Sequence, residues 1–309
     1  MSINEENLVE VDCVVCNSTS YETIFKVGKD NVPINFSICC DCGLAYLNPR
    51  WTKLAYNKYY ANEYDTDYRS EVLIPEKDSE KYLTSKQVIK RLSAQKLLPE
   101  NPKNILDVGS GMGWSSVYLK NHVYPNASFH AIEPSLHCQE NLKSHDIDVI
   151  TGDIDSNWNT AASKKFDLII MRHVLEHFMN PVEVLKKVSS SLSENGILYI
   201  AVPNTNRPGT PMREKFFRVV HTYYFTPESI SNCFNLSGLN LLHLKENDAD
   251  NPYEMYCVLK QGTVKDPKIS SSEYQRTKSQ LLKQHKREQS GLGLLQLKAK
   301  RRIGKILGK

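Results

Sequence analysis

The sequence predicts an α/β protein with a seven-stranded, mostly parallel sheet and flanking helices. Two observations support this class. Apolar runs of strand length alternate with stretches of helix length between residues 105 and 261. The first run, Ile105–Val108, ends at a glycine-rich turn that leads into an amphipathic stretch, as happens at the carboxyl end of a parallel strand. A small cysteine-bearing module before the sheet and a basic helical tail after it complete the expected organisation.

The uninterrupted apolar run FDLIIM at 166–171 predicts a fully buried strand, and we expect a helix at 181–192. The other strands are expected at 105–108, 128–132, 148–150, 197–202, 239–244 and 253–261. The chain is divided accordingly into a zinc-binding module (1–50), a tyrosine-rich connecting or lid segment (51–84), the α/β domain (85–261) and a basic tail (262–309).

The glycine-rich turn predicts a nucleotide-type ligand. Its pattern is Asp107-x-Gly109-x-Gly111-x-Gly113. Glycines permit positive φ and a close approach of the backbone to a ligand, and the helix start beyond them offers free N–H groups. Glu133 ends the next strand, where a carboxylate can accept hydrogen bonds from two ribose hydroxyls. The acid inside the first strand is absent from the dinucleotide pattern G-x-G-x-x-G, so this Rossmann-like fold is expected to bind S-adenosylmethionine.

The ordered motifs resemble those of the class I S-adenosylmethionine-dependent methyltransferases over roughly residues 85–261. The matching segments are DVGSGMG (107–113), IEP (132–134), GD (152–153), FDLIIMRHVLEH (166–177) and GILYIAVPN (196–204). The HVLEH variant is common in the branch that methylates small molecules and glycans. The resemblance implies a methyl-donor pocket formed by Asp107, Gly109, Gly111, Gly113, Glu133, Asp153, Ile154 and His173.

The resemblance also implies roles within that pocket. The turn around Gly111 would approach the methionine part of the donor, and Asp107 would help to hold its ammonium end. Glu133 would hold the ribose hydroxyls, while Asp153 and Ile154 would lie near the adenine.

Four cysteines ahead of the α/β domain predict a structural zinc site. CVVC (13–16) and CCDC (39–42) form two C-x-x-C pairs with 22 residues between them, close to zinc-ribbon spacing. Four thiolates suit tetrahedral zinc, whereas a catalytic zinc keeps an open position. The polar start of the chain predicts no signal peptide and a reducing compartment, which favours metal over disulfides. The expected ligands are Cys13, Cys16, Cys39 and Cys42, with Cys40 surplus and Cys138, Cys233 and Cys257 buried as small apolar residues.

This module and the tyrosines that follow resemble the N-terminal part of bacterial methyltransferases acting on sugars, surface glycans or related metabolites. The deoxysugar C-methyltransferases share the four-cysteine module but carry a further C-terminal domain. The tyrosines suit either packing between modules or a sugar-binding wall. They are Tyr56, Tyr59, Tyr60, Tyr64 and Tyr68.

A hydroxyl acceptor must lose its proton, and histidine suits that task near neutral pH. His221 is our first candidate for this base, because HTYYFTPE (221–228) resembles a segment that passes close to the acceptor in the glycan-type branch. His173, just beyond the fourth strand, is the second. The alternatives are packing of His173 over the cofactor and capping of the helix start at Thr226 by His221. His177 is expected to order its loop or cap a short helix.

The net charge of +4 is unevenly distributed. Residues 262–309 hold 13 Lys and Arg against 3 Asp and Glu, whereas the rest of the chain holds 26 against 32. The acidic body argues against extended nucleic-acid binding. The connection at 203–221 carries basic residues that suit either a phosphate or acidic sugar, or a solvated loop.

The tail is expected to act separately from the body. Its apolar residues with helical spacing are Leu292, Leu295, Ala299, Ile303 and Ile306. Such a helix suits an anionic membrane surface, a partner protein or a disordered end. No apolar run approaches the length of a membrane span. We therefore expect a cytoplasmic protein, with possible peripheral contact at the inner face of the cytoplasmic membrane through residues 290–309.

The expected function is O-methylation of a sugar hydroxyl in the biosynthesis of surface polysaccharide or a related glycan. The acceptor would be a sugar, a nucleotide sugar or a lipid-linked glycan. The alternatives are an RNA base methyltransferase and a non-catalytic cofactor-binding scaffold that docks through its tail.

Overall fold

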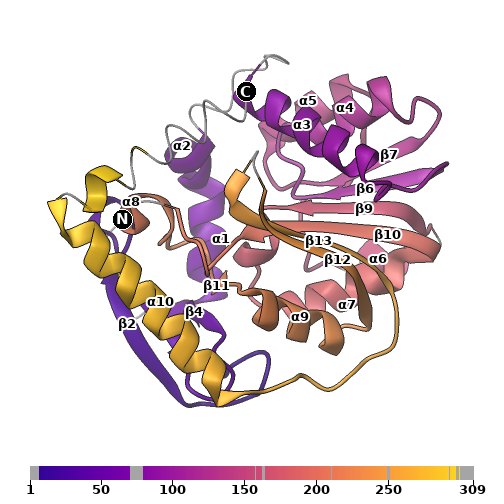
Figure 1. The fold of residues 1–309 in the computed structure, drawn as a ribbon. Helices are drawn as coiled ribbons and strands as arrows, with labels where there is room; N and C mark the ends of the chain where they lie inside the picture. Colours follow the sequence, from indigo (N-terminus) through magenta and orange to yellow (C-terminus); the bar gives the residue numbers. More distant parts are fainter. Residues whose placement is uncertain are drawn as a thin grey trace.

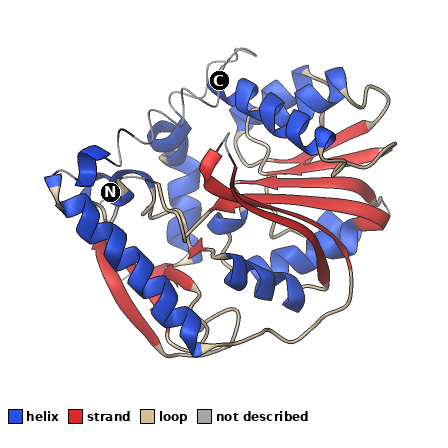
Figure 2. Cartoon of the chain, in the orientation of Figure 1, coloured by secondary structure: helices blue, strands red, loops and turns tan. Residues whose placement is uncertain are grey.

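The computed structural model describes residues 7–69, 79–156, 158–161, 164–209, 211–248, 251–291, 293–296 and 299. The chain forms a large sheet between two layers of helices, with a smaller sheet and one long helix to one side (Figures 1 and 2). Across the described ranges, no helix combines the length and the apolar character that crossing a bilayer requires.

The large sheet confirms the predicted fold class. Its seven strands are ordered β12-β13-β10-β9-β6-β7-β8, and β13 runs antiparallel to both of its neighbours. The strands are β6 (Asn104–Val108), β7 (Ser128–Ile132), β8 (Asp148–Thr151), β9 (Phe166–Arg172), β10 (Leu192–Pro203), β12 (Leu239–Asp248) and β13 (Asn251–Gln261). The chain order reverses between β6 and β9, and the carboxyl ends of strands at such a point form a ligand crevice.

Helices cover both faces of this sheet (Figure 1). One face carries α3 (Glu80–Ala94), α4 (Trp114–His122) and α5 (Leu136–Ser144), and the other carries α6 (Trp158–Ala161), α7 (Pro181–Ser191) and α9 (Pro227–Leu236). The expected helix at 181–192 corresponds to α7. The expected boundary between residues 84 and 85 falls inside α3, which begins at Glu80.

The small sheet combines the N-terminal module with a strand from the α/β domain. Its order is β11-β4-β3-β2, and β11 pairs antiparallel with β4. Its strands are β2 (Tyr21–Val27), β3 (Pro33–Cys39), β4 (Ala45–Leu47) and β11 (Tyr223–Tyr224), and a separate pair joins β1 (Leu8–Val9) to β5 (Arg50–Trp51). Short helical segments connect these parts: η2 (Lys29–Asn31), α1 (Lys53–Asn62), α2 (Tyr64–Arg69), η3 (Leu175–His177) and α8 (Met212–Lys215). The N-terminal module and the α/β domain therefore share one sheet.

The helix α10 (Ser271–Gln289) returns from the far side of the large sheet and lies along the small sheet (Figure 1). Leu281 is buried in the core beneath that sheet, together with Phe36 and Phe217. The ammonium of Lys278 lies 2.7 Å from a carboxylate oxygen of Glu22 on β2. The first part of the expected tail is thus a packed helix.

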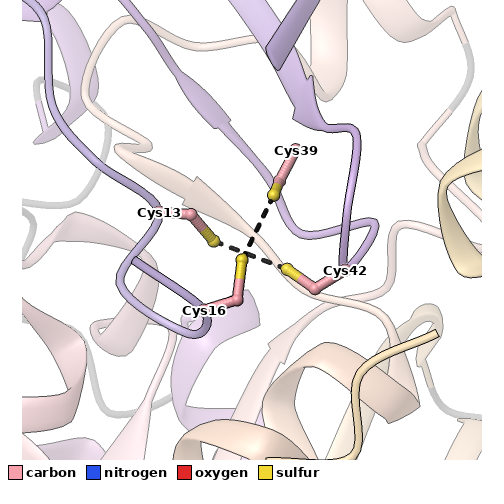
Figure 3. Close-up of side chains that lie close together, drawn as sticks. All are labelled: Cys13, Cys16, Cys39 and Cys42. Atoms are coloured by element: carbon pink, nitrogen blue, oxygen red, sulfur yellow. Dashed lines mark hydrogen bonds between the residues drawn. The ribbon is translucent and has the colours of Figure 1, made fainter. Parts of the chain in front are cut away.

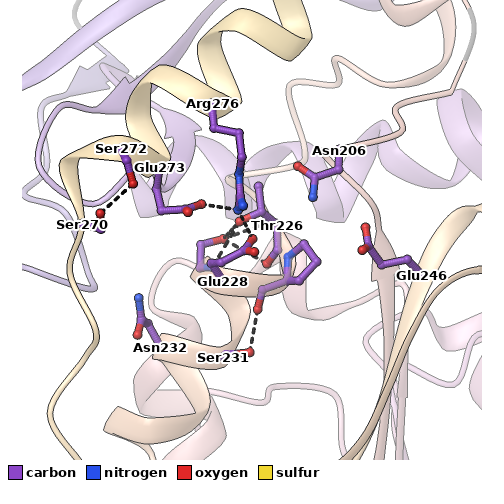
Figure 4. A network of polar contacts seen from close by, with 12 residues as sticks. Asn206, Thr226, Glu228, Ser231, Asn232, Glu246, Ser270, Ser272, Glu273 and Arg276 are labelled. Atoms are coloured by element: carbon purple, nitrogen blue, oxygen red, sulfur yellow. Dashed lines mark hydrogen bonds and ion pairs between the residues drawn. The ribbon is translucent and has the colours of Figure 1, made fainter.

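Arg276 connects α10 to the α/β domain (Figure 4). Its guanidinium lies 2.5 Å from Glu228 at the start of α9 and also pairs with Glu273 on α10 itself. Glu228 additionally lies where the helix macrodipole favours negative charge. The amphipathic stretch expected at the end of the tail falls largely outside the described residues, although Leu295 and Ala299 are described and exposed.

Replacing Leu281 by alanine tests the packing of α10. The side chain is 1 % exposed, so its loss leaves a cavity, and the free energy of unfolding should fall by about 2–5 kcal/mol. Leu282, the next residue, is 41 % exposed and provides the matched control. Urea unfolding of both variants checks this expectation, and equal stability losses would contradict a docked α10.

Candidate active site

A cavity of about 600 Å³ opens at the carboxyl ends of β6 and β9. Its walls come from the glycine-rich turn after β6, the segment after β9, the start of α3 and the connection between β10 and β11. Its polar and aromatic lining includes Tyr64, Lys81, Asp107, Arg172, His173, Glu176, His177, Lys215, Arg218 and His221. This volume lies within the range of pockets that enclose small ligands.

The glycine-rich turn has the backbone geometry that the sequence predicted. Gly109, Gly111 and Gly113 all have positive φ, at 66°, 56° and 75°. A Cβ on Gly109 would lie 2.5 Å from Val174, and one on Gly113 would lie 2.4 Å from Leu142, whereas one on Gly111 would meet nothing within 4 Å. Two glycines therefore permit packing of the turn, and Gly111 leaves room for a ligand.

Asp107 contributes a buried carboxylate to the cavity. It accepts a hydrogen bond from the Ser116 hydroxyl at 2.8 Å. Burial raises the pKa of Asp107 to about 7, even though the Ser116 hydrogen bond opposes the change. Desolvation of a carboxylate is costly, and a cationic ligand group nearby would offset that cost. Asp107 thus suits the ammonium end of S-adenosylmethionine. The open space at Gly111 and the size of the cavity also fit this ligand.

Glu133 is fully buried beneath the glycine-rich turn. One carboxylate oxygen accepts the Gly111 N–H at 2.7 Å, and the other accepts the Ser135 N–H at 3.0 Å. These bonds fix Glu133 next to the turn, although it is not among the residues that line the cavity in the described part of the chain. A ribose hydroxyl would have to compete with the Gly111 N–H for this carboxylate.

Asp153 and Ile154 follow β8 and also lie outside the cavity lining. Asp153 accepts the backbone N–H of Asp155 at 2.8 Å, and the Ile154 carbonyl accepts the Trp158 indole N–H at 3.1 Å. Of the expected donor-binding residues, Asp107, Gly109, Gly111 and His173 line the cavity, among the residues that the structure describes.

His173 lies between two carboxylates. Its Nε2 is hydrogen-bonded to Glu254 at 2.7 Å, and its Nδ1 lies 3.7 Å from Glu176. Burial alone would lower the pKa of His173, but the two carboxylates outweigh burial and raise it. Glu254, on β13, also pairs with Arg172 at 3.3 Å. Our sequence reasoning missed Glu254, although a single acid within the mostly apolar run 253–259 was an available signal.

The environment of His221 lowers its pKa, in contrast to the raised pKa of His173. The residue is 6 % exposed, and its Nδ1 has no hydrogen-bond partner among the described residues. Burial, followed by the neighbouring His177, lowers the pKa of His221 well below its usual value. Its ring is therefore neutral at neutral pH. The start of α9 is capped by the Thr226 side chain, which accepts the Ser229 N–H at 3.2 Å, so His221 is not needed as its cap.

Some side chains of the tyrosine-rich segment pack in the protein core, and others contact or line the cavity. Tyr56 is buried and donates to the Val219 carbonyl at 2.9 Å. The Tyr60 hydroxyl lies 3.1 Å from Nδ1 of His177, and Tyr64 lines the cavity. The side chain of Tyr68 lies outside the described part of the chain.

The basic connection between β10 and β11 places two of its cations at the cavity. Lys215 and Arg218 are part of the lining. Arg213 instead donates to Asn31 of the N-terminal module at 3.0 Å.

The four expected cysteines converge in the N-terminal module (Figure 3). Their sulfur atoms all lie within 4.8 Å of one another, with Cys13–Cys42 at 3.4 Å and Cys16–Cys39 at 3.5 Å. These distances are far beyond a disulfide bond and close to the about 3.8 Å between thiolates on one tetrahedral zinc.

The rest of the cysteines lie apart from this cluster. Cys40 does not belong to the converging group within the described residues, which agrees with its expected surplus role. Cys138, Cys233 and Cys257 are buried as free thiols, as expected.

Comparison with known proteins gives the family. A family model described as a methyltransferase domain matches residues 79–244. Among solved structures, an S-adenosylmethionine-dependent methyltransferase from Clostridium acetobutylicum is 17 % identical with a TM-score of 0.46. The match covers 67 % of this chain and 99 % of that one. An S-adenosylmethionine-dependent methyltransferase from Mesorhizobium loti is 18 % identical with a TM-score of 0.43, covering 55 % and 96 %. No curated protein sequence matches the chain.

The matching family model spans more than half of the chain, and its residues contain the glycine-rich turn and most of the cavity wall. The protein therefore belongs to the methyltransferase domain family and is a methyltransferase.

Proposed function

We propose that the enzyme methylates a hydroxyl group on a sugar, nucleotide sugar or lipid-linked glycan, in the biosynthesis of surface polysaccharide or a related glycan. The observation that carries the hydroxyl assignment is His221 in the wall of the cavity, a buried neutral imidazole whose Nδ1 has no hydrogen-bond partner among the residues that the structure describes. S-adenosylmethionine supplies a methyl group on a sulfonium, and a hydroxyl acceptor gives up its proton as it accepts that group.

The proposed donor subsite consists of Asp107, Gly109, Gly111 and Gly113, with Glu133 behind the turn. Asp107 would hold the ammonium end, because its buried carboxylate gains most from a cationic partner. Glu133 would hold the ribose hydroxyls after releasing the Gly111 N–H, while Asp153 and Ile154 would lie near the adenine. His173 would pack over the donor.

The proposed acceptor subsite lies on the other side of His173. His221 would remove the hydroxyl proton, because a general base must be unprotonated and must have a lone pair within reach of the proton. His173 remains the second candidate for this base. Its raised pKa and its contacts with two carboxylates favour the protonated form, which is less suited to accept a proton.

Charge and aromatic surface support a glycan acceptor. Tyr64 and Phe216 line the cavity, and aromatic faces of this kind can pack against sugar rings. Lys215 and Arg218 suit the phosphates of a nucleotide- or lipid-linked sugar. A lipid-linked acceptor would agree with contact between residues 290–309 and the inner face of the cytoplasmic membrane.

We propose that Cys13, Cys16, Cys39 and Cys42 bind a structural zinc ion. Four cysteine ligands leave no open coordination position, and Gly43 after the last ligand packs tightly against the backbone of Glu273 on α10. The metal would therefore hold the turn on which α10 rests.

Glu133→Gln tests the donor subsite. The substitution removes a charged acceptor, a change that costs about 1.5–3 kcal/mol, so affinity for S-adenosylmethionine should fall by about tenfold to a hundredfold. Calorimetric titration with S-adenosylmethionine and S-adenosylhomocysteine measures the change. The control is Glu183→Gln on the exposed surface of α7, and an unaltered affinity in Glu133→Gln would refute the assignment.

His221→Ala tests the acceptor subsite. Turnover on a hydroxyl acceptor should fall by about a hundredfold or more, because general base catalysis is lost, while donor affinity stays unchanged. Steady-state kinetics and donor titration on the same sample separate the two effects. His122→Ala, outside the cavity lining, is the control, and normal turnover in His221→Ala would exclude this role.

The zinc assignment predicts about one zinc ion per chain. Cys39→Ser should lower the zinc content and the thermal unfolding midpoint, because a structural metal contributes its binding energy to folding. Cys40→Ser changes the adjacent residue and should leave both quantities unchanged. Elemental analysis and thermal unfolding of both variants provide the measurement, and the same zinc content in both would contradict the assignment.

A further inference from the structure

Glu176 on η3 is a buried carboxylate whose oxygens accept no hydrogen bond within the described part of the chain. The residue is 1 % exposed. The nearest cationic candidates are the imidazoles of His173 at 3.7 Å and His177 at 4.0 Å. His173 makes its closer contact with Glu254, at 2.7 Å, so a ligand that supplies positive charge next to Glu176 would further offset the cost of burying this carboxylate.

Two imidazoles converge on the same point as Glu176. One ligand atom from each of Glu176, His177 and His221 lies within 4.8 Å of the others. Within the described ranges, Nδ1 of His221 has no hydrogen-bond partner, and the His221 ring centroid lies 4.8 Å from that of His177. An arrangement of this kind directs several lone pairs toward one region, and a cation placed there would satisfy them together.

We propose that Glu176, His177 and His221 bind a divalent first-row transition-metal ion such as Mn²⁺, and that its open positions take the acceptor oxygen. Imidazole and carboxylate ligands suit such ions better than they suit magnesium or calcium. Three protein ligands leave coordination positions free for a substrate, in contrast to the four-cysteine cluster. The inference rests on the proposed function for the identity of the acceptor, and in the metal-loaded enzyme it replaces the role of His221 as direct base with that of a metal ligand.

Two contacts hold the three proposed ligands close together. Glu176 and His177 are adjacent on η3, and the Glu176 carbonyl accepts the Thr222 hydroxyl at 3.0 Å. This bond ties η3 to the segment that carries His221. The Tyr60 hydroxyl at Nδ1 of His177 would orient that ring, as partners of metal-bound histidines commonly do.

Nearby charges leave the Glu176 carboxylate available to the cation. Arg172, the last residue of β9, pairs with Glu254 at 3.3 Å, and His173 also makes its closer carboxylate contact, at 2.7 Å, with Glu254. A metal-bound His221 cannot also accept the hydroxyl proton. In the loaded enzyme the ion would instead lower the pKa of the bound hydroxyl, and the proton would pass to solvent water in the cavity before the oxygen accepts the methyl group.

The test is a titration of the full-length, zinc-loaded protein with Mn²⁺, with free Mn²⁺ followed by electron paramagnetic resonance and no donor or acceptor present. We expect one Mn²⁺ site per chain in addition to the zinc. Glu176→Gln, His177→Asn and His221→Asn should each weaken binding by at least about tenfold, and Tyr60→Phe should weaken it by about tenfold through ring orientation.

Two control variants, Glu183→Gln and His122→Asn, should bind Mn²⁺ as the unmodified protein does. Donor affinity measured on each variant confirms that the fold is intact. If Glu176→Gln does not fold, His177→Asn and Tyr60→Phe still decide the question. Absence of Mn²⁺ binding, or equal binding in all variants, would overturn the proposal.

A second readout separates this inference from the proposed function. Mn²⁺ binding without methylation of any glycan would leave the metal site standing and remove the acceptor assignment. Glycan methylation that persists in a chelator, by a protein that binds no Mn²⁺, would remove the metal site and leave His221 as a direct base.

Discussion

The pairing of β11 with β4 is the interaction on which the candidate site depends. Tyr223 pairs with Tyr46, and Tyr224 with Ala45, so a segment of the α/β domain becomes the edge of the N-terminal sheet. His221 and Thr222 immediately precede this edge. Because strand pairing fixes the backbone on one side and the Thr222–Glu176 hydrogen bond fixes it on the other, His221 is held against η3. The N-terminal module thus forms part of the structure that positions His221 in the wall of the cavity.

The cysteine cluster lies at the turn before β4, the strand that pairs with β11. Cys39 ends β3 and Cys42 precedes β4, so the turn between the two strands closes around the cluster. A bound metal would fix that turn, and through β4 it would also fix the edge that carries His221. The same turn supports α10, because Gly43 lies against its backbone. The cluster can therefore influence the cavity without contributing an atom to it.

Local patterns predicted the features that arise from local structure. The glycine-rich turn and the cysteine pairs are short motifs whose geometry follows from residue type and spacing, and the structure places both as expected. The docking of α10 and the pairing of β11 could not be read from sequence, because they join segments far apart in the chain. Glu254 was missed for the same reason, since its role depends on His173 and Arg172 from a neighbouring part of the sheet. Glu133 was predicted to bind the donor from its position after the second strand, whereas its two backbone hydrogen bonds depend on the folded turn and could not be predicted.

Of the histidines that line the cavity, His173 and His221 show how the environment divides their roles. His173 contacts two carboxylates, so its pKa is raised and its charged form is favoured. His221 is buried beside another imidazole, so its pKa is lowered and its neutral form is favoured. A charged imidazole has no lone pair to offer, whereas a neutral one can accept a proton or bind a metal ion. Either role on the acceptor side therefore falls to His221, and His173 is better suited to connect the carboxylates of η3 and β13.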